Sequence, residues 1–155
     1  MDPINIAAPD FSYDESDPEN YRCGMHRIGK QLGLTSLGAS VYEIAPGQSL
    51  CPYHYEYGEQ EALLVLQGRP TLRRPQGTQV LEPWDTVGFP SGPEGAHKIT
   101  NETDENVRVF MFSTVTYPAA TVYPDSGKVG VWVGNPDDDL LARKSDKRDY
   151  YDGEV

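Results

Sequence analysis

Two stretches of the sequence carry side chains that could hold a metal ion. In the first, His54 and Glu56 stand two residues apart in a segment patterned like a β-strand, so both should lie on one face. Glu61 then opens a strongly apolar segment, where a buried carboxylate is costly unless a cation or hydrogen-bond donors compensate its charge. In the second stretch, His97 follows a loop dense in Gly and Pro, and antiparallel pairing could bring it opposite His54.

Together these two imidazoles and two carboxylates would form a ligand set whose negative charges balance one divalent cation. Mixed nitrogen and oxygen donors suit Fe, Mn, Zn or Ni and do not decide among them. Ordinary structural roles are the alternative: His54 and His97 as barrel residues with satisfied hydrogen bonds, and Glu61 as a strand-end carboxylate. Glu56 has three interpretations, as a ligand, as a free catalytic acid or base beside the metal, or as the mark of a site that has lost its ion.

The elements that must position these residues are short β-strands. From about residue 36, runs rich in Val, Ile, Leu, Tyr and Thr are separated by Gly, Pro and Asn, which is typical of an all-β sandwich or barrel. No segment shows a sustained helical periodicity of apolar residues. The predicted strands cover 37–44, 51–57, 61–67, 70–74, 78–81, 86–89, 96–101, 107–114, 120–123 and 129–133.

Both ends of the chain are polar and lack this strand pattern. We expect residues 1–35 to form an irregular N-terminal arm, with at most a short helical turn near 18–22. Residues 36–134 should form the barrel and residues 135–155 a C-terminal arm, all within one domain.

The two candidate stretches resemble the paired motifs of the cupin superfamily, G-x5-H-x-H-x4-E-x6-G and G-x5-P-x-G-x2-H-x3-N. The matching residues are Gly47, His54, Glu56, Glu61 and Gly68 in the first motif, and Pro90, Gly92, His97 and Asn101 in the second. The chain is most similar in this respect to small single-domain bacterial cupins of the cupin type-2 kind. The resemblance implies a double-stranded β-helix, or jelly-roll barrel, in which His54, Glu61 and His97 occupy metal-ligand positions.

The sequence departs from the first motif at its second His, which is Glu56 here. One extra residue also separates Gly47 from His54, and two extra residues separate Gly92 from His97. The interpretation is a metal-binding cupin that acts on a small organic molecule inside the barrel, by dioxygenation, isomerisation or a lyase step. The alternatives are a non-catalytic cupin that binds a small ligand with or without metal, and an interaction protein with a vestigial pocket.

Charge and composition narrow the class of partner and the compartment. A net charge of -11 repels phosphate backbones and anionic lipids, so nucleic acid and membranes are poor candidate partners. No apolar run is long enough for a transmembrane helix, and the first residues lack the pattern of a signal peptide. We therefore expect a cytoplasmic protein whose Cys23 and Cys51 are free thiols.

Alternation also makes a prediction about the opposite face of the His54 segment. If His54 and Glu56 point inward, Cys51 should point away from the pocket, and Tyr53, Tyr55 and Tyr57 should form an outward stripe. Tyrosine is enriched at protein interfaces because its ring buries well and its hydroxyl tolerates water. This stripe could be covered by a second subunit or by the terminal arms of the same chain. Together with the family resemblance, it favours a second subunit, and so a homodimer.

Overall fold

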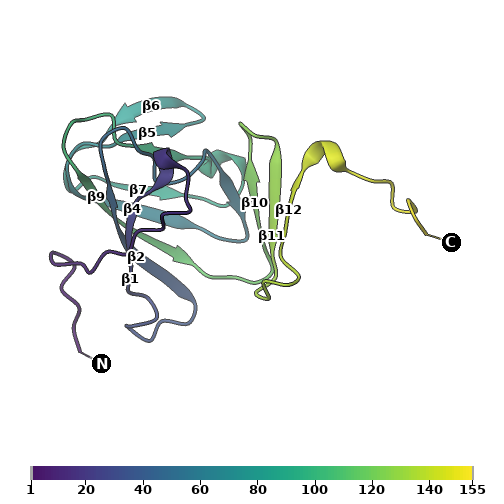
Figure 1. Cartoon of the computed structure of the whole chain (residues 1–155), viewed down its shortest axis with the longest axis horizontal. Helices are drawn as coiled ribbons and strands as arrows, with labels where there is room; N and C mark the ends of the chain where they lie inside the picture. The colour runs from purple at the N-terminus through teal and green to yellow at the C-terminus, as the bar shows by residue number, and fades with distance from the viewer. Residues whose placement is uncertain (1, 155) are drawn as a thin grey trace.

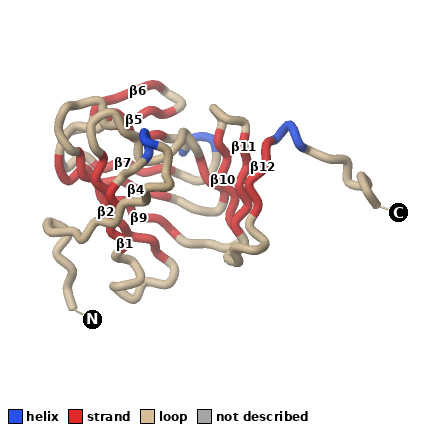
Figure 2. Tube along the Cα trace, in the orientation of Figure 1, coloured by secondary structure: helices blue, strands red, loops and turns tan. Residues whose placement is uncertain are grey.

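The computed structural model describes residues 2–154, which form three antiparallel sheets with loops and single-turn helices between them (Figures 1 and 2). The strands are β1 (Gly24–Arg27), β2 (Leu37–Ile44), β3 (Tyr55–Tyr57), β4 (Glu61–Gln67), β5 (Thr71–Arg74), β6 (Gly77–Val80), β7 (Thr86–Phe89), β8 (Lys98–Thr100), β9 (Val107–Thr114), β10 (Ala119–Tyr123), β11 (Lys128–Trp132) and β12 (Leu140–Arg143). The 3-10 turns are η1 (Glu19–Tyr21), η2 (Pro93–Gly95) and η3 (Lys144–Asp146).

The largest sheet has the order β1-β2-β9-β4-β7, and its longest pairing joins β2 to β9 from Leu37↔Thr114 to Ile44↔Val107. The second sheet has the order β12-β11-β10-β3, and the third has the order β6-β5-β8. Several neighbours in the sheets, such as β2 and β9, β3 and β10, and β5 and β8, lie far apart in sequence, as in a jelly roll. The predicted all-β jelly-roll class is confirmed.

The core lies where the largest sheet faces the third sheet. Along β9 the side chains alternate, with Val107, Val109 and Met111 buried and Phe112 on the outer surface. Leu63 and Val65 of β4 are fully buried by the same alternation. Burying each such side chain stabilises the fold by roughly 1.5–3 kcal/mol. The buried cluster comprises Ile44, Leu63, Val65, Leu72, Leu81, Phe89, Ile99, Val107, Val109 and Met111.

Four strands have the bounds predicted from the sequence, namely β2, β4, β7 and β9, and the helical turn expected near 18–22 is η1. Two strands, β1 and β12, lie inside the segments predicted to be irregular arms. Both are short and sit at sheet edges, β1 beside β2 and β12 beside β11. Four-residue edge strands depend on the neighbour that pairs with them, so they are hard to predict from their own sequence.

After η3 the chain runs away from the sheets to its C-terminal end (Figure 1). Tyr150 and Tyr151 are 86% and 73% exposed, so they do not anchor this segment on the barrel. Within residues 2–154 every helix is a single turn, too short to cross a bilayer.

The predicted tyrosine stripe is only partly open. Tyr53 is covered by Arg73, whose guanidinium lies 3.9 Å from the ring centroid, and Asp125 pairs with that guanidinium. Tyr55 is half-buried and packs edge-on against Tyr57, with ring centroids 5.5 Å apart. Tyr57 remains 48% exposed. The homodimer inferred from this stripe stays a prediction.

Candidate metal centre

A pair of backbone hydrogen bonds brings the two candidate histidines together. His54 N–H donates to the His97 carbonyl at 3.1 Å, and His97 N–H donates to the His54 carbonyl at 2.8 Å. The side chains of an antiparallel pair point to the same face, so the two imidazole centroids lie 4.6 Å apart. The prediction that His54 and His97 meet inside the barrel is confirmed, and both are buried.

Backbone carbonyls orient both imidazole rings. His54 Nδ1 lies 2.9 Å from the Pro52 carbonyl oxygen, and His97 Nδ1 lies 2.9 Å from the Gly95 carbonyl oxygen. A carbonyl oxygen only accepts hydrogen bonds, so each neutral ring carries its proton on Nδ1. Each Nε2 therefore presents a lone pair, as a metal-ligating imidazole does when its other nitrogen is held by a carbonyl.

The Nε2 atom of His97 is buried without a hydrogen-bond partner among the described residues. The residue is only 1% exposed, and the Phe89 ring stacks on it with centroids 3.7 Å apart. A buried acceptor with no donor costs free energy, and such atoms are rare in folded proteins. The lone pair is therefore available to a cation or a proton donor that reaches this cavity.

Glu61, the first residue of β4, supplies the carboxylate. Its Oε2 lies 3.4 Å from His97 Nε2 and 3.8 Å from His54 Nε2. Burial, together with the negative charges of Glu56 and Glu59, raises the pKa of Glu61 to about 8. Burial also lowers the pKa of His97 to about 4, with His54 contributing, and lowers the pKa of His54.

Both imidazoles are therefore neutral at pH 7, and their close approaches to Glu61 are not ion pairs. Three electron-pair donors converge on one point, two imidazole nitrogens and one carboxyl oxygen. Either a metal ion shared by all three or a proton held on Glu61 can stabilise this arrangement.

Cys51 also belongs to this centre, so the prediction that it points away from the pocket is wrong. One ligand atom from each of Cys51, His54 and His97 lies within 4.8 Å of the others. Strand alternation does not apply here, because β3 begins only at Tyr55 and Pro52 lies in the irregular segment before it. Burial raises the pKa of the Cys51 thiol, whereas a bound cation would favour the thiolate.

A cavity of about 200 Å³ opens beside these residues. Its wall combines the polar cluster with aliphatic and aromatic surface, from Tyr42, Leu50, Cys51, His54, Glu61, His97 and Met111. At roughly 30 Å³ per water molecule, the space holds about seven waters. The cavity therefore suits a small molecule that offers polar atoms to the histidine side and carbon to the rest.

Glu56 lies beside this centre but belongs neither to the closest group of ligand atoms nor to the residues that line the cavity. On β3 it pairs with Thr121 of β10, and Thr121 Oγ1–H donates to Glu56 Oε1 at 3.3 Å. Its negative charge nevertheless contributes to the raised pKa values of Glu61 and Tyr123. This position suits the free acid or base that the sequence left open, while ligation by Glu56 stays a prediction.

Asn101, which matches the last position of the second motif, has a structural role. It is fully buried, and its Nδ2 donates to the carbonyls of Ile44 and Glu105 at 2.8 and 2.7 Å. Its Oδ1 accepts hydrogen bonds from the backbone and hydroxyl of Thr103. These hydrogen bonds hold the loop between β8 and β9.

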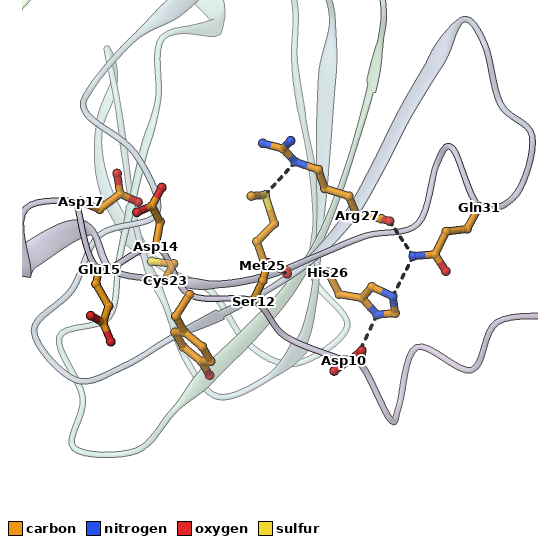
Figure 3. A pocket seen from close by; sticks show the side chains of 11 residues that line it. Asp10, Ser12, Asp14, Glu15, Asp17, Cys23, Met25, His26, Arg27 and Gln31 are labelled. Carbon is orange, nitrogen blue, oxygen red and sulfur yellow. Dashed lines mark hydrogen bonds between the residues drawn. The ribbon is translucent and has the colours of Figure 1, made fainter.

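A larger hollow of about 620 Å³ lies between the N-terminal segment and β1 (Figure 3). Its wall carries several carboxylates together with the third histidine, His26. Both ring nitrogens of His26 already have partners, the Asp10 N–H at 3.2 Å and the Gln31 side-chain amide at 3.2 Å. His26 therefore presents no free lone pair, and we place the metal centre at the smaller cavity.

Comparison with known proteins finds a matching domain family and solved structures that share this fold. Residues 40–113, which include all the candidate ligands, match the family model described as the cupin domain. No curated protein matches the sequence.

Solved structures share the fold over most of the chain. A candidate sugar phosphate isomerase from Acidithiobacillus ferrooxidans is 27% identical, with a TM-score of 0.76, covering 84% of this chain and 81% of its own. A sugar phosphate isomerase of the cupin superfamily from Silicibacter pomeroyi is 20% identical, with a TM-score of 0.81 and 97% and 98% coverage. The polyketide cyclase RemF from Streptomyces resistomycificus is 17% identical, with a TM-score of 0.61 and 74% and 79% coverage. The domain match and the shared fold show that residues 40–113 of this chain form a cupin domain.

Proposed function

We propose that the protein is a metal-dependent isomerase that moves a proton between adjacent carbons of a small hydroxycarbonyl compound, such as a sugar. The observation that carries the proposal is the buried, unpartnered Nε2 of His97, aimed at the same point as His54 and Glu61. The solved structures named as sugar phosphate isomerases agree with this reaction class.

The donor set fits a divalent cation. His54, His97 and Glu61 would hold it, with Cys51 close enough to contribute its sulfur. A thiolate donor favours Zn, Ni or Fe over Mn, because soft sulfur ligands suit the later transition metals. When bound, the ion would act as a Lewis acid that polarises the substrate carbonyl.

Glu56 would carry out the proton transfer. Its carboxylate lies beside the ligand set, where it can take the proton from the carbon next to the carbonyl and return it to the former carbonyl carbon. The hydroxyl proton on the first of these carbons passes to the former carbonyl oxygen, and the bond electrons shift within the substrate, so the step balances without an oxidant or reductant. The apolar walls supplied by Leu50 and Met111 would limit the access of competing water.

Deuterium exchange is the direct test of this activity. Untagged protein loaded with Zn or Ni, incubated with small aldoses and ketoses in D2O, should incorporate deuterium at the carbon next to the carbonyl, detected by NMR. The Glu56→Gln variant should bind the same metal and lose the exchange. Exchange that is equal in the parent and in Glu56→Gln would contradict the proposed role of Glu56.

A second candidate is a metal-free ligand-binding cupin. The raised pKa of Glu61 favours it, because a protonated Glu61 could itself occupy the His97 lone pair. Metal analysis of the untagged protein separates the two functions, since this alternative expects no stoichiometric metal.

A further inference from the structure

Glu56 is the last of three paired residues that lie side by side on the neighbouring strands β11, β10 and β3. In the second sheet, Thr121 of β10 pairs with Glu56 of β3 on one side and with Gly130 of β11 on the other. Paired residues of an antiparallel sheet point to the same face, so Thr121 and position 130 lie on the same face of the sheet as Glu56. Thr121 is only 3% exposed, which makes its hydroxyl a buried polar group that needs partners.

The Thr121 hydroxyl has a partner on each side. Trp132 Nε1–H donates to Thr121 Oγ1 at 2.8 Å, and Thr121 Oγ1–H donates to Glu56 Oε1 at 3.3 Å. Since the indole N–H only donates, it fixes the direction of the Thr121 hydroxyl proton toward the carboxylate. The two hydrogen bonds therefore run in one direction, from the Trp132 indole through the Thr121 hydroxyl to the Glu56 carboxylate.

Gly130 makes room for this arrangement. A Cβ atom at position 130 would lie 2.5 Å from Cζ2 of the Trp132 indole, well inside van der Waals contact. The ring can lie across the strand toward Thr121 only because residue 130 has no side chain. The Gly-Val-Trp sequence at 130–132 thus places an indole N–H beside the glutamate hydrogen bond.

We propose that Trp132 and Thr121 are positioning residues that hold Glu56 out of the metal's ligand set. Glu56 follows His54 by two residues on the same face, about 7 Å along a strand. A glutamate side chain can cover much of that distance, so an unrestrained Glu56 carboxylate would swing to the cation and become an additional ligand. The hydrogen bond from Thr121 prevents this and keeps Glu56 free for proton transfer, an inference that rests on the proposed function.

Cobalt(II) provides the test, because its visible absorption bands weaken strongly when a fifth ligand joins a four-coordinate ion. We expect the Co(II)-loaded parent to show intense bands, and Thr121→Val to lose at least half of that intensity. Thr121→Ser, which keeps the hydroxyl, should retain the parent spectrum. Trp132→Phe should move the spectrum toward that of Thr121→Val, whereas the matched control Trp84→Phe, which changes an indole that is 73% exposed, should not.

The double variant Thr121→Val/Glu56→Gln decides the cause of the change. If Glu56 is the added ligand, removing its charge should restore the intense bands of the parent. Unchanged bands in Thr121→Val, or weakened bands that persist in the double variant, would overturn the inference while leaving metal binding intact. A parent that binds no cobalt would instead contradict the proposed function and, with it, the positioning role.

Discussion

Metal binding to this centre should weaken steeply as the pH falls, because the proton and the cation compete for Glu61. Burial raises the pKa of that carboxyl to about 8, so at neutral pH most of the metal-free protein carries the proton. Binding a cation must then release it. The two imidazoles add nothing above pH 7, since burial lowers both of their pKa values.

The size of the effect follows from the fraction of Glu61 that is ionised. With a pKa of about 8, one half of the carboxyls are ionised at pH 8 and about 1% at pH 6, so the affinity should fall about 50-fold between these values. If Cys51 also binds as a thiolate, a second proton is released and the slope becomes steeper, because burial raises the pKa of its thiol.

Isothermal titration calorimetry with zinc, in buffers of different ionisation enthalpy, counts the released protons. We expect at least one proton per zinc at pH 6.5 for the parent, and one fewer for Glu61→Gln. The Cys51→Ser variant shows whether the thiol contributes a second. Affinity that stays constant from pH 6 to pH 8, or proton uptake on binding, would refute this account of Glu61.

Three further predictions concern other residues. Glu56→His should retain or strengthen binding of Ni or Zn, because it adds an imidazole that suits these ions; a folded variant that binds far more weakly would contradict this. Both cysteines are free in the structure, and burial raises the pKa of the Cys23 thiol to about 11. In a Cys51→Ser background, Cys23 of the folded protein should therefore react with Ellman's reagent at pH 8 much more slowly than Cys23 of the unfolded chain. A mass change on reduction would contradict the free thiols. Light scattering should show a dimer at micromolar concentration that Tyr55→Asp disrupts, and a parent that remains monomeric would exclude the homodimer.

The sequence predicts the main strands and the histidine pair for a common physical reason. The long strands β2, β4 and β9 are runs of seven or eight residues rich in Leu, Val, Tyr and Phe, a composition that predicts strands from the sequence alone. Spacing within the two motifs then places His54, Glu61 and His97 on inward faces, where the structure brings them together.

What sequence reasoning missed depends on irregular backbone or on distant partners. Cys51 enters the centre because the chain before β3 is not a strand, so counting alternate faces back from His54 fails at Pro52. Thr121 lies 65 residues from Glu56, and only the pairing of β3 with β10 brings their side chains together. No spacing rule in a single sequence carries that information.

The central claim is that these side chains form a metal centre, and metal content measures it most directly. Untagged protein, loaded with zinc and freed of excess by gel filtration, should retain about one zinc per chain by plasma mass spectrometry, as expected for a single site. His97→Ala, which removes the unpartnered Nε2, should retain almost none, while His26→Ala, which changes the histidine outside the centre, should match the parent. Equal zinc in the parent and in folded His97→Ala, or none in the parent at pH 8, would contradict the claim.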